Sequence, residues 1–263
     1  MSFDYVIVGG GSAGAALAAR LTEDPNTTVC LLEAGGQGKS LLVRAPAAVV
    51  AVLPGRPKMG NWAYETVPQD GLNGRKGYQP RGKALGGSSA MNAMLYIRGH
   101  HKDYDGWADL GCTGWSWNEV LPYFRRSENN ERGANPDHGA SGPLHVSDQK
   151  SPRPISHAFV DAAAQMQHRI QDDFNTGDTE GVGLYQVTQF HDPARNGERC
   201  SAAAAYLHPV MQRPNLKVHT GAHATRILFQ GKRATGVTYR QGREDKKVEA
   251  RREVILCGGA FNS

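Results

Sequence analysis

A glycine-rich turn between an apolar strand and a helix is the feature that most limits how this chain can fold. Residues 4–8 form a short apolar run that predicts a buried parallel strand. The run leads into Gly9, Gly11 and Gly14, which have GxGxxG spacing, and a helix is expected over residues 15–22. A second apolar strand over residues 28–32 ends at Glu33, an acid at about the distance that a dinucleotide fingerprint requires.

This order of strand, glycine turn, helix and strand predicts a dinucleotide site. A diphosphate would rest against backbone N–H groups at the helix N-terminus, over Gly11, Ser12 and Ala13. Glu33 would accept hydrogen bonds from the adenosine ribose, and Ala34 follows it in the same turn. A glycine-rich turn without a ligand is the alternative.

Residues 10–14 also spell GxSxG, the nucleophile elbow of serine hydrolases, with Ser12 as the nucleophile. Such an elbow normally follows several strands, and here the first strand has none before it. The hydrolase reading also leaves Gly9 and Glu33 unexplained. We therefore rank hydrolase well below a dinucleotide-binding protein.

A second glycine cluster lies in residues 82–105, where Gly86, Gly87 and Ser88 follow Arg81 and Lys83. Glycines let backbone N–H groups approach a ligand, and consecutive N–H groups form an anion-binding nest. The stretch resembles the first signature of the glucose–methanol–choline (GMC) oxidoreductases, FAD enzymes that oxidise alcohols.

The resemblance implies FAD rather than NAD and assigns further residues to the cofactor. It places Arg81, Gly82 and the residues after Gly86 and Gly87 along the pyrophosphate and ribityl chain. It also implies flavin-ring contacts from Asn92, Ala93 and Met94, an adenine contact near Ala224, and a close approach at Cys257, Gly258 and Ala260.

Two further positions follow from the resemblance. Trp62 is either a residue near the flavin or an ordinary core aromatic. Met91 stands where some relatives carry a histidine joined covalently to the flavin. Methionine cannot form that bond, so non-covalent FAD is implied.

The expected fold class is α/β, with a Rossmann-like FAD-binding domain that contains a parallel sheet and a β-meander. Residues 1–145 and 206–263 are assigned to this domain, and residues 146–205 to the start of an α+β substrate domain. The pattern predicts helices over residues 156–166 and 199–211, and strands over residues 183–190, 216–220, 225–229, 234–239 and 253–257. The aromatics of residues 106–126 are expected in a core, and residues 129–142 in a surface loop.

The resemblance implies oxidation of an alcohol, choline-like or aliphatic, by hydride transfer to flavin N5. The electron acceptor is a quinone or dye-like compound, or oxygen in an oxidase. Residue 263 falls within the family's second signature, and the family's catalytic base lies further on, so no catalytic residue is assigned. The 263-residue chain alone is expected to be inactive, and a non-catalytic FAD- or nucleotide-binding fragment is the alternative.

Composition excludes several classes of protein. The net charge of +5 is mild, and no aromatics alternate with the basic residues, so nucleic acid is not an expected partner. No apolar run nears the roughly 20 residues that span a bilayer. The dispersed cysteines predict no metal site, with Cys30 and Cys257 as buried thiols, and the adjacent His100 and His101 are not expected to share a metal. A cytoplasmic location is expected, with peripheral attachment to the inner membrane left open.

Overall fold

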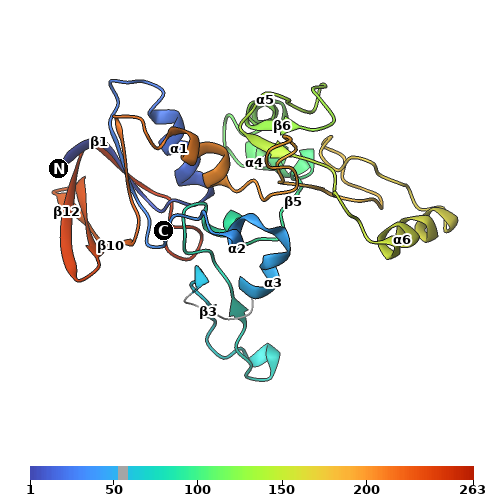
Figure 1. Cartoon of the computed structure of the whole chain (residues 1–263), viewed down its shortest axis with the longest axis horizontal. Helices are drawn as coiled ribbons and strands as arrows, with labels where there is room; N and C mark the ends of the chain where they lie inside the picture. The colour runs from blue at the N-terminus through green and yellow to red at the C-terminus, as the bar shows by residue number, and fades with distance from the viewer. Residues whose placement is uncertain (53–58) are drawn as a thin grey trace. The chain divides into compact units, whose positions relative to one another are not determined.

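The computed structural model describes residues 1–52 and 59–263 and divides the chain into two compact units (Figure 1). Unit 1 comprises Met1–Ala93 and Ser201–Ser263, and unit 2 comprises Met94–Cys200. The second boundary lies near the expected one after residue 205, but the first falls after residue 93 instead of residue 145. Residues 94–145 join unit 2 because their strands β5 (Leu95–Tyr96) and β6 (Glu128–Asn130) pair with later strands of that unit.

Unit 1 is built on a six-stranded sheet with the order β10-β11-β12-β1-β2-β9. Strands β1 (Ser2–Val8), β2 (Val29–Leu32) and β9 (Leu216–His219) run parallel, and β1 also pairs in parallel with β12 (Glu244–Leu256). Strands β10 (Ala222–Gln230), β11 (Arg233–Gln241) and β12 form an antiparallel meander. The predicted α/β fold, with its parallel sheet and β-meander, is confirmed.

Alternating residues of β1 and β2 explain why this sheet is buried on both faces. Ile7, Val29 and Leu31 pack on one face against α1 (Ser12–Leu21), whose Ala15 and Ala18 are fully buried. Val6, Cys30 and Leu32 pack on the opposite face with the meander. The small alanines of α1 let the helix lie close to the sheet, and this sets its N-terminus at the end of β1.

The other elements of unit 1 are short. They are α2 (Leu41–Arg44), η1 (Pro46–Ala48), α3 (Val49–Val52), β3 (Tyr64–Glu65), η3 (Asp70–Leu72), β4 (Tyr78–Gln79) and η4 (Gly87–Ala90). The helix expected over residues 199–211 is shorter than predicted and is not a regular α-helix. The segment instead forms a π-helical turn, η5 (Ala203–Leu207), followed by the 3₁₀ turn η6 (His208–Val210). Pro209 has no N–H to continue an α-helical ladder, which is consistent with the change of helix type at this point.

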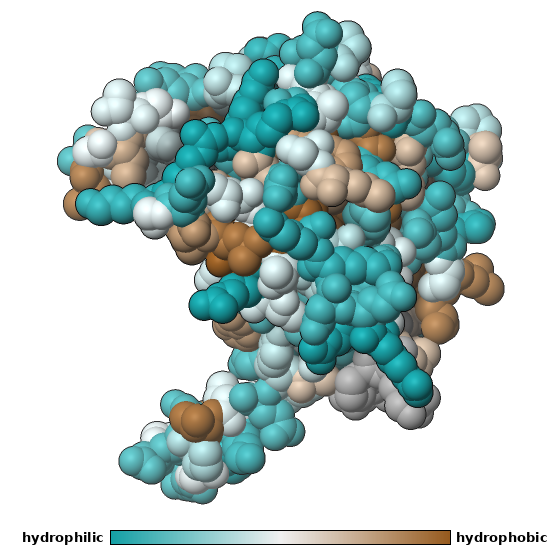
Figure 2. All heavy atoms as spheres, turned by 90° about the vertical axis from the view of Figure 1, so that its left-hand side faces the viewer, coloured by the Kyte–Doolittle hydropathy of each residue, from teal (hydrophilic) through white to brown (hydrophobic). Residues whose placement is uncertain are grey.

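The meander carries the basic residues of the C-terminal region. Its exposed faces hold ion pairs such as Arg240 with Asp245 at 2.8 Å and Lys247 with Glu249 at 2.9 Å. Figure 2 views the molecule from this side, and hydrophilic residues cover most of the face. The mixture of signs fits a solvated surface.

Unit 2 contains α4 (His101–Asp109), α5 (Trp117–Ser127), α6 (Pro154–Gln165), β7 (Leu144–Val146) and β8 (Gln186–Val187). β5 pairs with β8 and β6 with β7. The strand predicted over residues 183–190 is reduced to the two residues of β8. Across the described parts of both units, every helix is too short or too polar to cross a membrane.

Two expectations for unit 2 are corrected. The aromatic rings of residues 106–126 contact one another edge to face or at a tilt, but Trp107, Trp115 and Tyr123 stay exposed, so these residues do not form a closed core. Residues 129–142 are not simply a surface loop, because Asn130 and His138 are buried. Their polar side chains are buried because they hydrogen-bond to one another and to Glu128.

Candidate cofactor site

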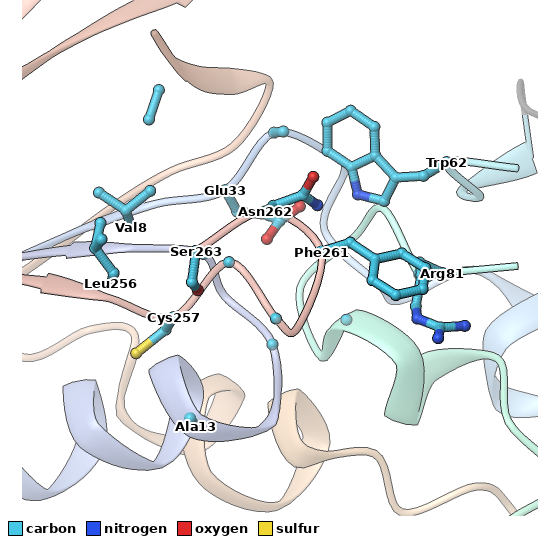
Figure 3. Close-up of a pocket in the computed structure, with 18 of the residues that line it drawn as sticks. Val8, Ala13, Glu33, Trp62, Arg81, Leu256, Cys257, Phe261, Asn262 and Ser263 are labelled. Carbon is cyan, nitrogen blue, oxygen red and sulfur yellow. The ribbon is translucent and has the colours of Figure 1, made fainter. Parts of the chain in front are cut away.

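The carboxyl ends of three neighbouring parallel strands in unit 1 open into one cavity of about 560 Å³ (Figure 3). Val8 ends β1, Leu32 ends β2 and Leu256 ends β12, and all three line the cavity. Ligands of open α/β sheets bind at this edge, because loops and helix N-termini converge there. The volume is that of a site for a small molecule or cofactor.

The first glycine turn is fixed by close backbone packing. Gly9 has a φ of 101°, and a Cβ at this position would lie 2.3 Å from the carbonyl oxygen of Cys257. A Cβ on Gly14 would lie 1.9 Å from the carbonyl oxygen of Gly9. Only glycine allows β1, β12 and α1 to meet this closely.

Gly11 differs from these two glycines, because the space beside it is open. It is the N-cap of α1, has no side-chain cap, and is followed by a first turn without acidic residues. A Cβ there would meet only the Cα of Gly87, at 3.8 Å. The N–H groups of the first turn, including those of Ser12 and Ala13, have no intrahelical acceptor and adjoin the cavity, as an anion-binding site requires.

The second glycine cluster packs directly against the first. The Gly86 N–H donates to the carbonyl oxygen of Gly10 at 2.7 Å. Gly87 has a φ of 53°, and a Cβ on it would come within 2.8 Å of the Gly11 Cα. The two turns therefore form one cradle of backbone, which a side chain at either position would fill.

Two cations lie beside this cradle, each over an aromatic ring. The Arg81 guanidinium carbon lies 4.3 Å from the ring centroid of Phe261, and Nη1 donates to the Pro80 carbonyl oxygen at 2.6 Å. The Lys83 ammonium lies 4.2 Å from the ring centroid of Trp62. Arg81 lines the cavity. A diphosphate between Arg81 and α1 would have a cation and N–H donors available.

Glu33 is buried at the end of β2 and accepts two backbone hydrogen bonds. Its Oε2 accepts from the Gly10 N–H at 2.9 Å, and its Oε1 accepts from the Gly35 N–H at 2.7 Å. Burial raises the pKa of this carboxyl, although the N–H groups of Gly35 and Gly10 and the charge of Lys83 act against the rise. A carboxylate has about four acceptor positions, so capacity remains for ribose hydroxyls.

Aromatic rings form another wall of the cavity. Trp62 stacks on Tyr64 with ring centroids 5.7 Å apart and meets His223 edge to face at 5.5 Å. Trp62 therefore lines the cavity and also packs against other aromatics. His223 lies on β10, next to Ala222, whose N–H donates to the Glu33 carbonyl oxygen at 2.8 Å.

The structure brings most of the predicted site residues together. Those lining the cavity are Gly9, Gly11, Ser12, Ala13, Glu33, Ala34, Trp62, Arg81, Gly82, Gly87, Ser88, Ala224, Cys257, Gly258 and Ala260. Gly14 and Gly86 lie behind it as packing positions, and Asn92, Ala93 and Met94 are not part of its lining. Cys257 is half-buried rather than buried, and burial raises the pKa of its thiol.

Several lining residues carried no sequence signal that singled them out. They are Val8, Leu32, Ala222, His223, Leu256, Gly259, Phe261, Asn262 and Ser263. The three strand-end residues could have been found from topology, since parallel strands end at one edge of the sheet. The rings of His223 and Phe261 could not, because a lone aromatic gives no indication of which surface it faces.

The geometry also bears on the hydrolase and metal alternatives. Within residues 1–52 and 59–263, the Ser12 hydroxyl has no hydrogen bond to a histidine, as a nucleophile would need. Across the same residues, no group of three or more His, Cys, Asp or Glu side chains could hold a metal ion. The rings of His100 and His101 lie 4.0 Å apart, and His101 Nδ1 is 2.8 Å from the Gly177 carbonyl oxygen.

Comparison with known proteins identifies the family. The family model described as GMC oxidoreductase matches residues 3–263. The chain belongs to the GMC oxidoreductases. It is 46% identical over 264 residues to an alcohol dehydrogenase (acceptor) from Pseudomonas putida, an alignment that covers 99% of this chain and 47% of that protein. It is also 46% identical over 268 residues to a mitochondrial choline dehydrogenase from Mus musculus, covering 99% and 44%.

Solved structures of GMC oxidoreductases share the fold. Pyridoxine 4-oxidase from Mesorbium loti superposes with a TM-score of 0.90 at 36% identity, over 98% of this chain and 50% of that chain. The chain thus spans about half the length of the curated relatives it matches. An FAD-dependent oxidoreductase from Chaetomium thermophilum also superposes, with a TM-score of 0.88 at 33% identity, over 98% of this chain and 45% of that chain.

The residues present fit the FAD of this family. The uncapped helix N-terminus and the backbone cradle of Gly11 and Gly87 suit a diphosphate, and the buried Glu33 suits a ribose. Both features lie on one continuous cavity, as an extended dinucleotide needs.

Proposed function

We propose that this chain binds FAD in the cavity of unit 1 and forms the cofactor-binding part of an alcohol-oxidising GMC oxidoreductase. The observation that carries the proposal is the convergence of two glycine turns, an uncapped helix N-terminus and Glu33 on one cavity. Unit 1 corresponds to the FAD-binding domain, and unit 2 to the beginning of the substrate domain.

The chain's own residues bind and orient the cofactor. N–H groups at the start of α1 and in the Gly87–Ser88 turn hold the diphosphate, and Arg81 balances its charge. Glu33 accepts from the ribose and keeps its carboxylate fixed through Gly10 and Gly35. Attachment is non-covalent, since Met91 offers no nucleophile. The chemistry that FAD supplies is acceptance of a hydride at flavin N5 from the carbinol carbon of an alcohol.

The substrate class follows from the relatives rather than from the cavity. The similar proteins include an alcohol dehydrogenase and a choline dehydrogenase, so a primary alcohol, aliphatic or choline-like, is proposed as the donor. The acceptor is a quinone or dye-like compound, with oxygen as the alternative, because an oxidase is among the solved neighbours. Removal of the hydroxyl proton needs a general base, and none of the residues lining the cavity is assigned to it.

A ligand series tests the cofactor assignment. Binding of FAD, FMN and NAD to the purified chain would be followed by flavin fluorescence or by calorimetry. FAD should bind more tightly than FMN, because FMN lacks the adenosine that Glu33 and β10 would contact. Tighter binding of NAD than of FAD would contradict the proposal.

The reaction is tested on the full-length gene product. Choline and straight-chain primary alcohols would be assayed once with an artificial dye and once with oxygen as acceptor. Alcohol-dependent dye reduction would support a dehydrogenase, and peroxide formation would support an oxidase. If the protein binds FAD but shows neither activity, the result would favour the alternative of a non-catalytic FAD-binding protein.

A further inference from the structure

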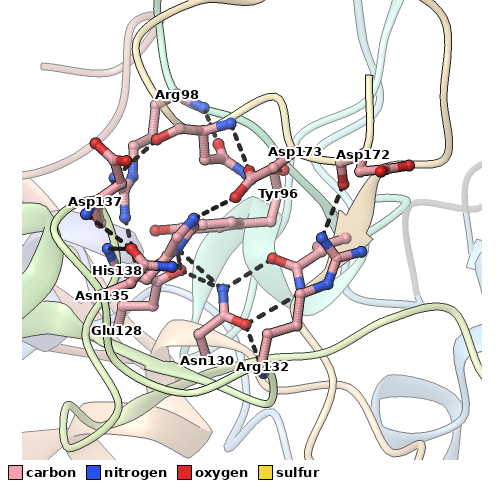
Figure 4. Close-up of polar contacts among 12 residues, drawn as sticks. Tyr96, Arg98, Glu128, Asn130, Arg132, Asn135, Asp137, His138, Asp172 and Asp173 are labelled. Carbon is pink, nitrogen blue, oxygen red and sulfur yellow. Dashed lines mark hydrogen bonds and ion pairs between the residues drawn. The ribbon is translucent and has the colours of Figure 1, made fainter. Parts of the chain in front are cut away.

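Four ionisable side chains form a continuous chain of contacts in the interior of unit 2 (Figure 4). They are Arg98, Glu128, His138 and Asp173. The side chains of Arg98, Glu128 and His138 are 1%, 0% and 3% exposed, and that of Asp173 is 22% exposed. Buried charges persist only where partners compensate for lost hydration, so each contact in this chain matters.

Glu128 receives donors from every side. Its Oε2 accepts from Arg98 Nη2 at 2.8 Å and from the Gly139 N–H at 3.1 Å. Its Oε1 accepts from Asn130 Nδ2 at 3.0 Å and lies 2.9 Å from His138 Nδ1. A carboxyl surrounded by donors is an ionised carboxylate.

Both nitrogens of His138 face carboxylates. Nδ1 lies 2.9 Å from Glu128 Oε1, and Nε2 lies 2.7 Å from Asp173 Oδ2. Asn130 Nδ2 is also 3.0 Å from Nδ1, but its two hydrogens already go to Glu128 Oε1 and Gln186 Oε1. Each ring nitrogen must therefore donate, and only the doubly protonated, positively charged ring can do so.

These contacts fasten segments that are far apart in the sequence. Glu128 begins β6, His138 lies in the following loop, and Asp173 lies beyond α6. The Asp173 Oδ1 accepts from the Asn175 N–H at 2.8 Å. The side chain of Asn175 in turn hydrogen-bonds to the backbone at the end of β5. Its Oδ1 accepts from the Arg98 N–H, and its Nδ2 donates to the Tyr96 carbonyl oxygen.

We propose that His138 is a pH-sensitive clasp in unit 2, whose charged ring joins Glu128 to Asp173 and thereby holds the 172–175 segment against β5 and β6. When the ring loses a proton, one nitrogen can no longer donate. Its lone pair then faces a carboxylate oxygen at hydrogen-bond distance. The two repel each other, and the contact between His138 and that carboxylate is lost. This inference does not depend on the proposed function.

The charges around the ring set the pH at which the clasp opens. Burial disfavours the charged ring, but the hydrogen bonds from Asp173 and Glu128 outweigh burial and raise the pKa of His138 to about 9. Arg98 and Arg132 act more remotely, through Glu128 and Asp173. The pKa of His138 in the folded chain lies above its ordinary value of about 6.5. The clasp therefore contributes its full stabilisation below about pH 6.5, and this stabilisation is lost as pH rises through about 9.

Hydrogen exchange on the intact chain tests the clasp. The amides of Arg98, Gly139 and Asn175 each donate into the network. Pulse labelling at pH 7 and pH 10, with times scaled to the intrinsic rates, should show their protection falling by more than about tenfold at pH 10, where most of the rings have lost a proton. The amides of Val237 and Val248, in the core of unit 1, should keep theirs.

Variants separate the clasp from general loosening at high pH. In His138→Gln the three amides should be weakly protected at both pH values, whereas His101→Gln, outside the network, should retain the wild-type change. Should His138→Gln fail to fold, Asp173→Asn serves in its place and should lower the His138 pKa measured by NMR. Equal protection of the wild-type amides at both pH values, or titration of His138 at or below pH 7, would overturn the proposal.

Discussion

The Glu33 carboxylate accepts a hydrogen bond from the backbone N–H of Gly10 at 2.9 Å, across the turn that joins β1 to α1. The residue expected to bind ribose is thus also part of what shapes the glycine turn. A Cβ on Gly10 would sit 3.3 Å from the same carboxylate and 2.7 Å from a Leu85 methyl group, so the contact leaves little room. Ligand binding and local stability are therefore coupled at this position.

Glu33→Ala is expected to weaken both FAD binding and the fold. The substitution leaves the buried N–H of Gly10 and the half-buried N–H of Gly35 without their acceptor, and loss of the buried one alone costs about 1–3 kcal/mol. Urea unfolding without cofactor and FAD titration would measure the two effects separately. Glu23→Ala, which removes an exposed ion pair with Arg20, is the control and should change neither by more than about 1 kcal/mol.

Gly11 and Gly14 should respond differently to a side chain. Gly11→Val should fold but lose FAD, because its side chain would project into the open cradle beside Gly87. Gly14→Ala should lower stability even without FAD, because its Cβ would lie 1.9 Å from the Gly9 carbonyl oxygen. Circular dichroism melting and FAD titration on both variants test the pair. Retained FAD affinity in Gly11→Val would show that the diphosphate lies elsewhere.

Flavin should leave the protein completely on denaturation. Met91 is buried and carries no nucleophile for a flavin bond. After acid precipitation all flavin absorbance is expected in the supernatant, and none in the pellet. Flavin that stays with the polypeptide would mean that another residue forms a covalent link, and peptide mass spectrometry would identify it.

The first part of the fold could be predicted because its signals are local. β1, the glycine turn, α1, β2 and Glu33 are consecutive, and each is set by neighbours in the sequence. Residues 129–142 were misjudged because their polarity suggested water, whereas their partners are distant. Arg98 is 30 residues from Glu128, and Gln186 is 56 residues from Asn130. Polar residues that hydrogen-bond to one another across such distances leave no periodic pattern in the sequence.

The same reasoning applies to the site. Glycines could be assigned because the turn and the close approach each demand that residue, whatever surrounds it. His223 and Phe261 could not, because their place in the cavity depends on the meander and on the loop after β12. A single sequence shows where the backbone requires glycine. It does not show which residues from separate segments line the same cavity.

The N-terminal strand should make unit 1 sensitive to acid through Asp4. Its Oδ2 accepts from Arg251 Nη2 at 3.1 Å and from the N–H and hydroxyl of Thr28 at 2.9 and 2.8 Å. The Arg251 hydrogen bond, followed by those of Thr28, holds the pKa of Asp4 well below its usual range. The carboxylate therefore stabilises the fold above its ordinary pKa of about 4, and this stabilisation is lost as pH falls through the folded pKa.

Asp4→Asn keeps an acceptor oxygen but removes the charge, so the variant should be less stable than wild type at pH 7 and closer to it at pH 3. Urea unfolding at the two pH values measures this difference. Asp70→Asn, at an exposed position in η3, should follow wild type at both. A gap between wild type and Asp4→Asn that is the same at pH 3 and pH 7 would mean that the charge contributes nothing. The stabilising contribution of Asp4 would then come from its hydrogen bonds to Thr28 alone.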